Sequence, residues 1–310
     1  MLAALGLLAL GGALLWAGAE TAIRGATATA RALRVPAFVL GALLFGIDLE
    51  GLGTAVGASA AGEPLLAAGE IFGTVLFLFG AAFGVALIVS KEPLRAPEPL
   101  MVLAPAIPLF AAALVIADRF VGRIEATLLI GIYAGYVALV LREGRLARAR
   151  ADELERETGE TRRSRPALLA MTLGGLVLLS LGAGLAVAGG SRFATEAGLS
   201  EGFVGAAVLG VLVSLDEVLL EVLPVRRGAP GLATGNLLGT LAAFCSGVLG
   251  VAALVRPLDI DSAGALAYLG AAFLYAVVAT AFLARGRAGW RLGVFTLSFY
   301  ALWLVTAAEL

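Results

Sequence analysis

The chain of 310 residues is 60% hydrophobic and 15% charged, and its formal net charge is −1. A soluble core cannot hide this much apolar surface, so the composition predicts a polytopic membrane protein surrounded mainly by lipid. The near-zero charge argues against nucleic acid as a partner. Histidine is absent and Cys245 is the single cysteine. This excludes an intrachain disulfide, an imidazole or thiolate metal site, and the Ser-His and Cys-His nucleophilic pairs.

The apolar segments are long enough for ten membrane crossings. A transmembrane helix needs about 20 mostly apolar residues, and polar residues divide the chain into ten such segments. The first segment lacks the basic start of a cleavable signal, and its first positive charge is Arg24, so it is expected to be retained as a span. The predicted spans are 2–22, 35–58, 64–89, 98–117, 123–142, 166–189, 202–224, 230–254, 262–284 and 288–308.

The positive residues predict the orientation of these spans. With the N-terminus outside, 18 of the 22 Lys and Arg residues fall in cytoplasmic loops, as the positive-inside rule requires. We therefore expect a multi-pass protein of the plasma (cytoplasmic) membrane with both its N- and C-termini outside.

A polar stretch separates two halves of the chain. The segment REGRLARARADELERETGETRRSR, at 142–165, has few apolar residues at helical spacing. It predicts a five-span half at 1–142, a cytoplasmic linker at 143–165 and a second five-span half at 166–310. A solvated linker is the simplest interpretation, and a regulatory or partner-binding role stays open. No obligate protein partner is evident from the sequence.

The two halves contain a similar phrase at a constant offset of 166 residues. GEPLLAAGEIFGTVLFLFG at 62–80 aligns with GAPGLATGNLLGTLAAFCSG at 228–247. Because one period holds five spans, the second copy must cross the membrane in the opposite sense. Inverted repeats of this kind are typical of secondary transporters, which bind substrate near the midplane. Close helix packing alone produces Gly and Ala similarities, but it does not explain the matched Pro, Thr and acidic positions.

Acidic residues lie within the predicted spans of both repeats. Such residues are costly in a bilayer and rarely face lipid. The same segments contain no Lys or Arg, so the missing positive partner is predicted to be a mobile inorganic cation. Oxygen ligands suit hard ions such as Ca²⁺, Na⁺ and Mg²⁺, and also protons. The acids are Asp48, Glu50, Glu70, Asp216, Glu217 and Glu221, with Ser214, Thr74, Thr240 and Asn236 beside them.

The segments VSLDEV at 213–218 and GNLLGT at 235–240 carry a pattern that resembles the cation/Ca²⁺ exchanger superfamily, the sodium/calcium and proton/calcium antiporters. That family usually reads Gly-Thr-Ser-x-Pro-Glu and then Gly-Asn-x-x-Gly-Ser-Asn. The first motif is matched at Ser214 and Glu217, and the second at Gly235, Asn236 and Gly239. The resemblance covers nearly the whole chain. It implies an all-α membrane protein with ten transmembrane helices in two inverted-topology five-helix repeats.

The first half departs from the family pattern. In GIDLEG at 46–51, Glu50 stands at the Pro position and Gly51 stands where the pattern has Glu. In GEIFGT at 69–74, Glu70 replaces Asn. Asp216 also takes the Pro position in the second half. These departures imply a divergent branch of the family, and they leave open whether Glu50 or Glu70 replaces the acid missing at Gly51.

Residue types and the resemblance together suggest roles. We expect Glu217 to be the central metal ligand, with Glu50 and Glu70 as further metal ligands or proton carriers. Glu221, close to Arg226 and Arg227 in the sequence, is expected to line the path by which ions reach the site or to pair with those arginines. Cys245 is expected to be an ordinary packing residue. Further cation-binding oxygens are expected from Asp48, Asp216, Ser214, Asn236, Thr74 and Thr240.

These features predict a secondary active antiporter rather than an enzyme, with no cofactor. Ca²⁺ or another divalent cation would exchange for Na⁺ or H⁺ by alternating access, as the bundle of spans 1 and 6 moves against the rest. Protons suit the empty site, because desolvation disfavours the charged form of a buried carboxyl group.

Two other functions are compatible with parts of the sequence. One is a sensor or scaffold that has lost transport, and it is supported by Gly51, which stands where the family pattern has Glu. An intramembrane metal-dependent enzyme would need an Asp-rich motif and a basic pocket, and the repeats have neither.

Overall fold

The protein is almost entirely helical in the computed structural model, which describes residues 1–90, 92–94, 99–154, 165–197, 214–261 and 263–307. The elements of the first half are α1 (Leu2–Leu33), α2 (Ala37–Leu40), η1 (Gly41–Phe45), α3 (Leu49–Ala61), α4 (Pro64–Phe77), η2 (Leu78–Ala82), α5 (Phe83–Val89), α6 (Pro99–Leu103), α7 (Ala106–Val115), η3 (Ile116–Asp118), β1 (Phe120–Val121) and α8 (Arg123–Leu154). Those of the second half are α9 (Arg165–Glu196), α12 (Leu215–Arg226), α13 (Pro230–Ala242), η5 (Ala243–Val248), α14 (Leu249–Val255), β2 (Leu258–Asp259), α15 (Ala263–Ala284) and α16 (Trp290–Ala307).

Seven helical segments in the described part of the chain are long and apolar enough to cross a membrane. They correspond to the first six predicted spans and the eighth. Two shorter apolar helices, Leu269–Ala284 and Trp290–Val305, lie within the ninth and tenth. The predicted span 202–224 begins outside the described residues, and its later part forms α12. The apolar, all-helical character expected of a membrane protein is therefore confirmed.

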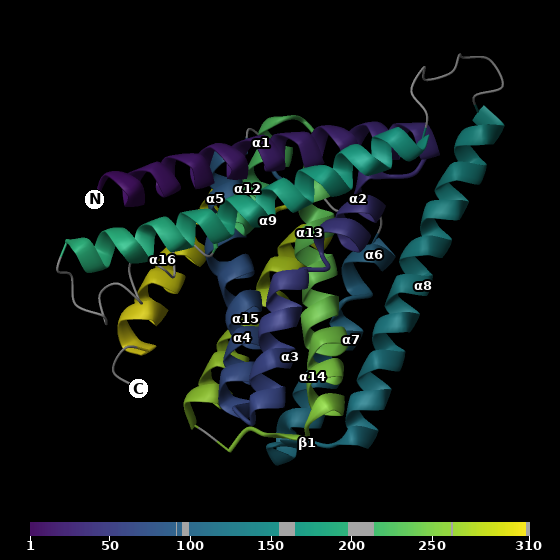
Figure 1. Ribbon diagram of the computed structural model, residues 1–310. Coiled ribbons are helices and arrows are strands. Elements are labelled where there is room, and N and C mark those ends of the chain that lie inside the picture. The colour runs from purple at the N-terminus through teal and green to yellow at the C-terminus, as the bar shows by residue number, and fades with distance from the viewer. Residues whose placement is uncertain (91, 95–98, 155–164, 198–213, 262, 308–310) are drawn as a thin grey trace.

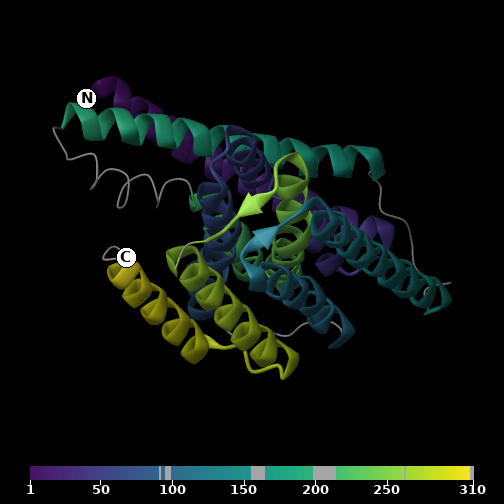
Figure 2. The ribbon, with the colours of Figure 1, turned by 90° about the horizontal axis from the view of Figure 1, so that it is seen from below.

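Helices α1 and α9 form a separate layer across one end of the molecule. Figure 1 shows the two helices side by side, steeply inclined to the upright group that contains α3, α4, α13 and α14, and Figure 2 shows the same pairing from below. The chain directions are opposite, because Gly11 lies against Ala186 and Gly25 lies against Thr172.

Glycines allow α1 and α9 to approach until their backbones touch. A methyl group on Gly18 would lie 2.8 Å from the carbonyl oxygen of Gly175, and one on Gly182 would lie 2.9 Å from that of Gly11. Small residues at such an interface replace side-chain packing with backbone contact, which is a common way to join helices in lipid. The contact glycines recur every seventh residue on both helices: Gly11, Gly18 and Gly25 on α1, and Gly175, Gly182 and Gly189 on α9.

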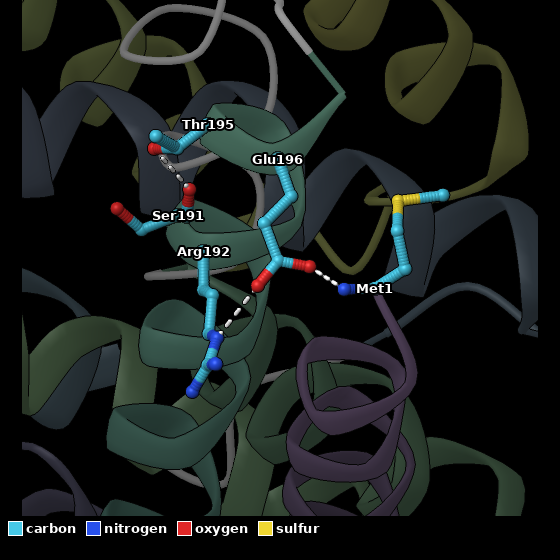
Figure 3. Close-up of polar contacts among 5 residues, drawn as sticks. All are labelled: Met1, Ser191, Arg192, Thr195 and Glu196. Carbon is cyan, nitrogen blue, oxygen red and sulfur yellow. Dashed lines mark hydrogen bonds and ion pairs between the residues drawn. The ribbon is translucent and has the colours of Figure 1, made fainter.

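An ion-pair cluster joins one end of this helix pair. The carboxylate of Glu196, at the end of α9, accepts a hydrogen bond of 2.8 Å from Nε of Arg192 and also pairs with the amino group of Met1 (Figure 3). One turn of the same helix is held by Thr195, whose hydroxyl donates to the carbonyl oxygen of Ser191. The surroundings are exposed, so we assign these contacts only a small contribution to stability.

The second span, predicted over 35–58, is broken in the structure. The chain runs through α2 and the π-helical η1, leaves helical geometry at residues 46–48, and starts α3 at Leu49. Asp48 caps the new helix, because its Oδ1 accepts a hydrogen bond of 2.9 Å from the backbone N–H of Glu50. A carboxylate cap therefore starts a helix inside a span, at a depth where a backbone cannot be left unsatisfied.

Two long helices form the core around this break. The helices from Pro64 and from Pro230 both begin with proline in the first turn, where its missing N–H is harmless. Each later contains a π-helical stretch, η2 and η5. The most deeply buried side chains include Phe72, Phe79, Phe83 and Phe244 of these helices. Strands β1 and β2 pair antiparallel, and Leu94 makes a separate bridge to Ala288.

Helix α8 extends beyond its predicted end. The sequence places the boundary at residue 142, but the helix continues to Leu154. The first part of the predicted linker is therefore helical, and residues 155–164 lie outside the described residues.

We expect Gly18→Ala to separate α1 from α9, because even a methyl group there meets the backbone of α9. Overpacking of this kind costs about 1–3 kcal/mol. The measurement is the Tm of the purified protein in detergent. Gly12→Ala is the matched control, since nothing in the described structure lies within 4 Å of a methyl group on Gly12 of the same helix. Equal Tm values for the two variants would contradict the packing account.

Candidate cation site

A cavity of about 640 Å³ lies where the broken second span meets α4 and α12. Its polar side chains come from both halves of the chain, and its apolar side is completed by α5 and α16. We call it the acidic cavity. The described lining residues include no Lys or Arg. They are Asp48, Glu50, Gly51, Thr54, Gly69, Glu70, Gly73, Thr74, Phe77, Ala81, Val85, Ser214, Leu215, Asp216, Glu217, Val218, Tyr300 and Leu304.

Two helix N-termini meet at the acidic cavity. Asp48 is the N-cap of α3 and Ser214 is the N-cap of α12, and these residues are 166 positions apart. The first turns carry Glu50 on α3 and both Asp216 and Glu217 on α12. The positive end of a helix dipole stabilises negative charge in the first turn. The local fold therefore favours carboxylates at this position, although the cavity lies within the membrane-spanning part of the chain.

Several carboxylate oxygens of α12 have no partner within the described structure. Oδ1 of Asp216 and Oε2 of Glu217 are shielded from solvent and accept no hydrogen bond. A buried oxygen of this kind is costly unless a donor, proton or cation satisfies it. These oxygens are therefore available to a cation that enters the cavity.

The acids do not form a ready-made metal centre. Among the described residues, no three acidic side chains converge closely enough to hold one metal ion together. The proposed metal ligands Glu217, Glu50 and Glu70 therefore surround one cavity without meeting at one point.

Glu221 lies outside the acidic cavity, among the most buried polar residues. It is fully shielded from solvent, and its Oε1 accepts a hydrogen bond of 2.9 Å from Nδ2 of Asn236, while its Oε2 has no partner in the described structure. Within the described residues, Glu221 does not make the expected pair with Arg226 or Arg227. Arg227 instead donates a hydrogen bond of 2.7 Å to Glu20 of α1, which also pairs with Arg24.

The predicted oxygen donors of the two repeats occupy different surroundings. Thr74 lines the acidic cavity with Glu70. Asn236 and Thr240 are only 3% and 2% exposed, and α13 packs tightly against the broken second span, where a methyl group on Gly46 would lie 2.8 Å from the backbone nitrogen of Thr240. The structure therefore brings Ser214, Thr74 and five of the predicted acids to one cavity, and it places Asn236, Thr240 and Glu221 away from its lining.

Two polar residues of the described lining, Thr54 and Tyr300, were not predicted from the sequence. Thr54 lies one turn after Glu50, and its hydroxyl donates to the Glu50 carbonyl oxygen, so the i, i+4 spacing was the available signal. Tyr300 belongs to α16 and packs edge-to-face on Phe77 at a centroid distance of 5.9 Å. A single tyrosine in an apolar span gives no such signal.

A family comparison identifies the class of protein to which the chain belongs. The model described as "Sodium/calcium exchanger protein" matches residues 3–142 and 167–308. The chain therefore belongs to the sodium/calcium exchanger protein family, a class of membrane transporters. The resemblance found from the sequence motifs is confirmed.

Individual relatives are distant but extend over most of the chain. The chain is 26% identical over 261 residues to a putative antiporter, CaxA, of Alkalimonas amylolytica, covering 81% of this chain and 80% of the relative. It is 24% identical over 255 residues to an uncharacterized membrane protein of Methanocaldococcus jannaschii, with 82% of each covered.

The fold is similar to that of the sodium-calcium exchanger NCX_Mj. The structure soaked with zero Na⁺ and Ca²⁺ superposes with a TM-score of 0.83 at 22% identity, over 98% of both chains. The structure soaked with 2.5 mM Na⁺ and 0.1 mM Sr²⁺ gives 0.82 over 100% of this chain and 99% of the other. At this identity the likeness shows the fold alone.

The buried pair of Glu221 and Asn236 gives a stability prediction. We expect Asn236→Leu, which leaves the Glu221 carboxyl group without its donor, to cost about 1–3 kcal/mol. Glu221→Met, in turn, leaves the Asn236 amide without its hydrogen-bond acceptor. The double variant is expected to lose less free energy of unfolding than the two single variants lose together, with a coupling energy of about 1 kcal/mol. The measurement is a double-mutant cycle of thermal unfolding in detergent.

The control for this cycle is Thr280→Val. The Thr280 hydroxyl is also buried, but it has no hydrogen-bond partner in the described structure. Its removal should leave the Tm unchanged or raise it. Additive effects of the Glu221 and Asn236 substitutions would show that their hydrogen bond does not contribute to stability.

Proposed function

We propose that this protein is a secondary active cation antiporter that exchanges Ca²⁺, or another divalent cation, for Na⁺ or H⁺ across the plasma (cytoplasmic) membrane. The observation that carries the proposal is the acidic cavity, which five carboxylic side chains from three helices line without a basic residue among the described lining. Oxygen-only surroundings suit hard cations. The names of the putative antiporter CaxA and the sodium-calcium exchanger NCX_Mj agree with this class.

The proposed topology is ten spans in two inverted halves, 1–142 and 166–310, with a cytoplasmic linker at 143–165 and both termini outside. Two structural features at the same offset of 166 support it. The N-caps Asp48 and Ser214 are one such pair. The π-helical stretches η2, starting at Leu78, and η5, which contains Phe244, are another. An odd number of spans in each half would turn the second copy over and bring both caps to one site.

In the proposed cycle, a divalent cation binds between carboxylates that lie on separate helices. Glu217 is the central ligand, and Glu50 and Glu70 are further ligands or proton carriers. Asp48, Asp216, Ser214 and Thr74 supply nearby oxygens. Asn236 and Thr240 would join the ligand set only in another conformation, because they are buried away from the cavity in this one. The α1–α9 layer moves against the remaining helices to change the accessible side.

The charge of the acidic cavity favours a proton as part of the exchange. One divalent cation balances two of the five carboxylates that line it. The remaining charges would repel one another at short range in a medium of low dielectric constant. Protons remove that repulsion when the cation leaves, and they do so without the volume of additional metal ions.

Transport into liposomes tests this proposal. Purified protein is reconstituted, Na⁺ and pH gradients are imposed separately, and Ca²⁺ uptake is followed. We expect uptake driven by at least one gradient. Glu217→Gln should lower it by about tenfold or more, because affinity depends on ligand charge.

Glu63→Gln is the matched control for this substitution. Glu63 is the N-cap of α4 and lies outside the described lining of the cavity, so this variant should transport normally. If neither gradient moves Ca²⁺, Mg²⁺ or Mn²⁺, the exchanger proposal fails and a non-transporting sensor or scaffold is the better interpretation.

A further inference from the structure

The two repeats distribute their acids differently over facing helices. In the second half, Glu217 lies on α12 and the amide of Asn236 lies on α13. At an offset of 166, the matching positions of the first half are Gly51 on α3 and Glu70 on α4. One half therefore has an acid followed by an amide, and the other has a glycine followed by an acid. The acid missing from one helix is present on its neighbour.

The structure shows which groups a second acid in the first half would displace. A methyl group on Gly51 would lie 3.2 Å from Oε1 of Glu70, 2.7 Å from Cζ of Phe244 and 2.5 Å from Oδ2 of Asp48. The Asp48 side chain cannot easily move, because its other oxygen caps α3. The space in which a side chain at position 51 would begin is thus already bordered by the carboxylates of Asp48 and Glu70.

We infer that Glu70 supplies, from α4, the cation-binding carboxylate of the first half, which Glu217 supplies from α12 in the second half, and that Gly51, the repeat partner of Glu217, makes room for it. This inference rests on the proposed function and assigns one residue of the same site. The cation is then held between α4 and α12, rather than between the two capped helices α3 and α12. Glu70 and Glu217 both line the acidic cavity and lie within electrostatic reach of each other.

Glu50 is the competing residue, and its surroundings differ. It is exposed, whereas Glu70 is half-buried. It is also next to Gly51 on the same helix, so its side chain projects about 100° away from that of position 51. The carboxylate of Glu70, in contrast, approaches the very space that a side chain at position 51 would enter. Glu70 is therefore the better substitute.

The direct test compares Ca²⁺ binding by Glu70→Gln and Glu50→Gln. The readout is the Ca²⁺-dependent rise in Tm of the full chain in detergent, titrated to obtain an apparent Kd. We expect Glu70→Gln to weaken binding at least about tenfold more than Glu50→Gln, because it removes a charged ligand of the ion. An equal or larger loss in Glu50→Gln overturns the inference.

A transplant of the second-half pattern makes the test sharper. The triple variant D48S/G51E/E70N gives the first half the residue types found at Ser214, Glu217 and Asn236. Serine keeps a capping side chain at the start of α3. The matched control D48S/G51Q/E70N has the same shape without the added charge. We expect the first variant to bind Ca²⁺ at least about tenfold more tightly than the second.

The outcomes separate this inference from the proposed function. If both transplant variants fold and bind Ca²⁺ with equal affinity, the inference is overturned. If either variant fails to fold, the comparison of Glu70→Gln with Glu50→Gln decides. Wild-type transport together with normal binding by Glu70→Gln overturns the inference and leaves antiport standing. Binding that depends on Glu70 without transport under any gradient supports the inference and overturns antiport. A wild-type chain that neither binds nor transports Ca²⁺, Mg²⁺ or Mn²⁺ overturns both.

Discussion

The structure depends on the carboxylates of α12 that are shielded from solvent and have no basic partner within the described part of the chain. Asp216 and Glu217 each carry an oxygen that is shielded from water and accepts no hydrogen bond in the described structure. Such groups are stable only if something positive reaches them, and one fixed source of compensation is the positive end of α12, in whose first turn both residues lie. That compensation is partial. Under the proposed function, small cations and protons supply the remaining compensation at this site.

Helix breaks and close helix contacts make this arrangement possible. In a continuous second span, the backbone N–H and C=O groups at this point would pair within the helix, and no helix end would face the cavity. The interruption at 46–48 creates an N-terminus there, and Asp48 satisfies part of it. Tight packing keeps the break in place, since Gly41 and Gly46 of the broken span lie directly against the backbone of α13. A larger residue at either position would push α13 away.

Much of the fold could be predicted from the sequence, because hydropathy and proline position act locally. The starts predicted at 64 and 230 coincide with the proline-led helices α4 and α13. The interruption after Gly46 was missed, since apolar residues flank it and an average over the span hides it. The seven-residue spacing of glycines in α1 and α9 was visible in the sequence, but its meaning depends on which helix faces which, and only the three-dimensional arrangement shows this.

The candidate site was predictable in its residue types and less so in its contacts. Five acids identified from the sequence line one cavity. Glu221 was expected near Arg226 and Arg227, because these residues are close in sequence. In the fold, α12 ends at Arg226, and the next residue, Arg227, donates a hydrogen bond to Glu20 of α1. The Glu221 side chain faces α13, where it accepts a hydrogen bond from Asn236. Contacts between helices that are distant in the chain decide such partners, and no local pattern records them.

The length of α1 and α9 has a consequence for the lipid around the protein. Each helix has 32 residues and is therefore about 48 Å long, against a hydrocarbon layer about 30 Å thick. A pair of this length would extend beyond the layer if it stood upright, and its inclination to the other helices in Figure 1 fits an oblique crossing or a position along the interface. Because the two backbones touch, both helices must tilt together. The thickness of the bilayer, and hence the acyl-chain length of its lipids, then acts directly on the angle of this layer.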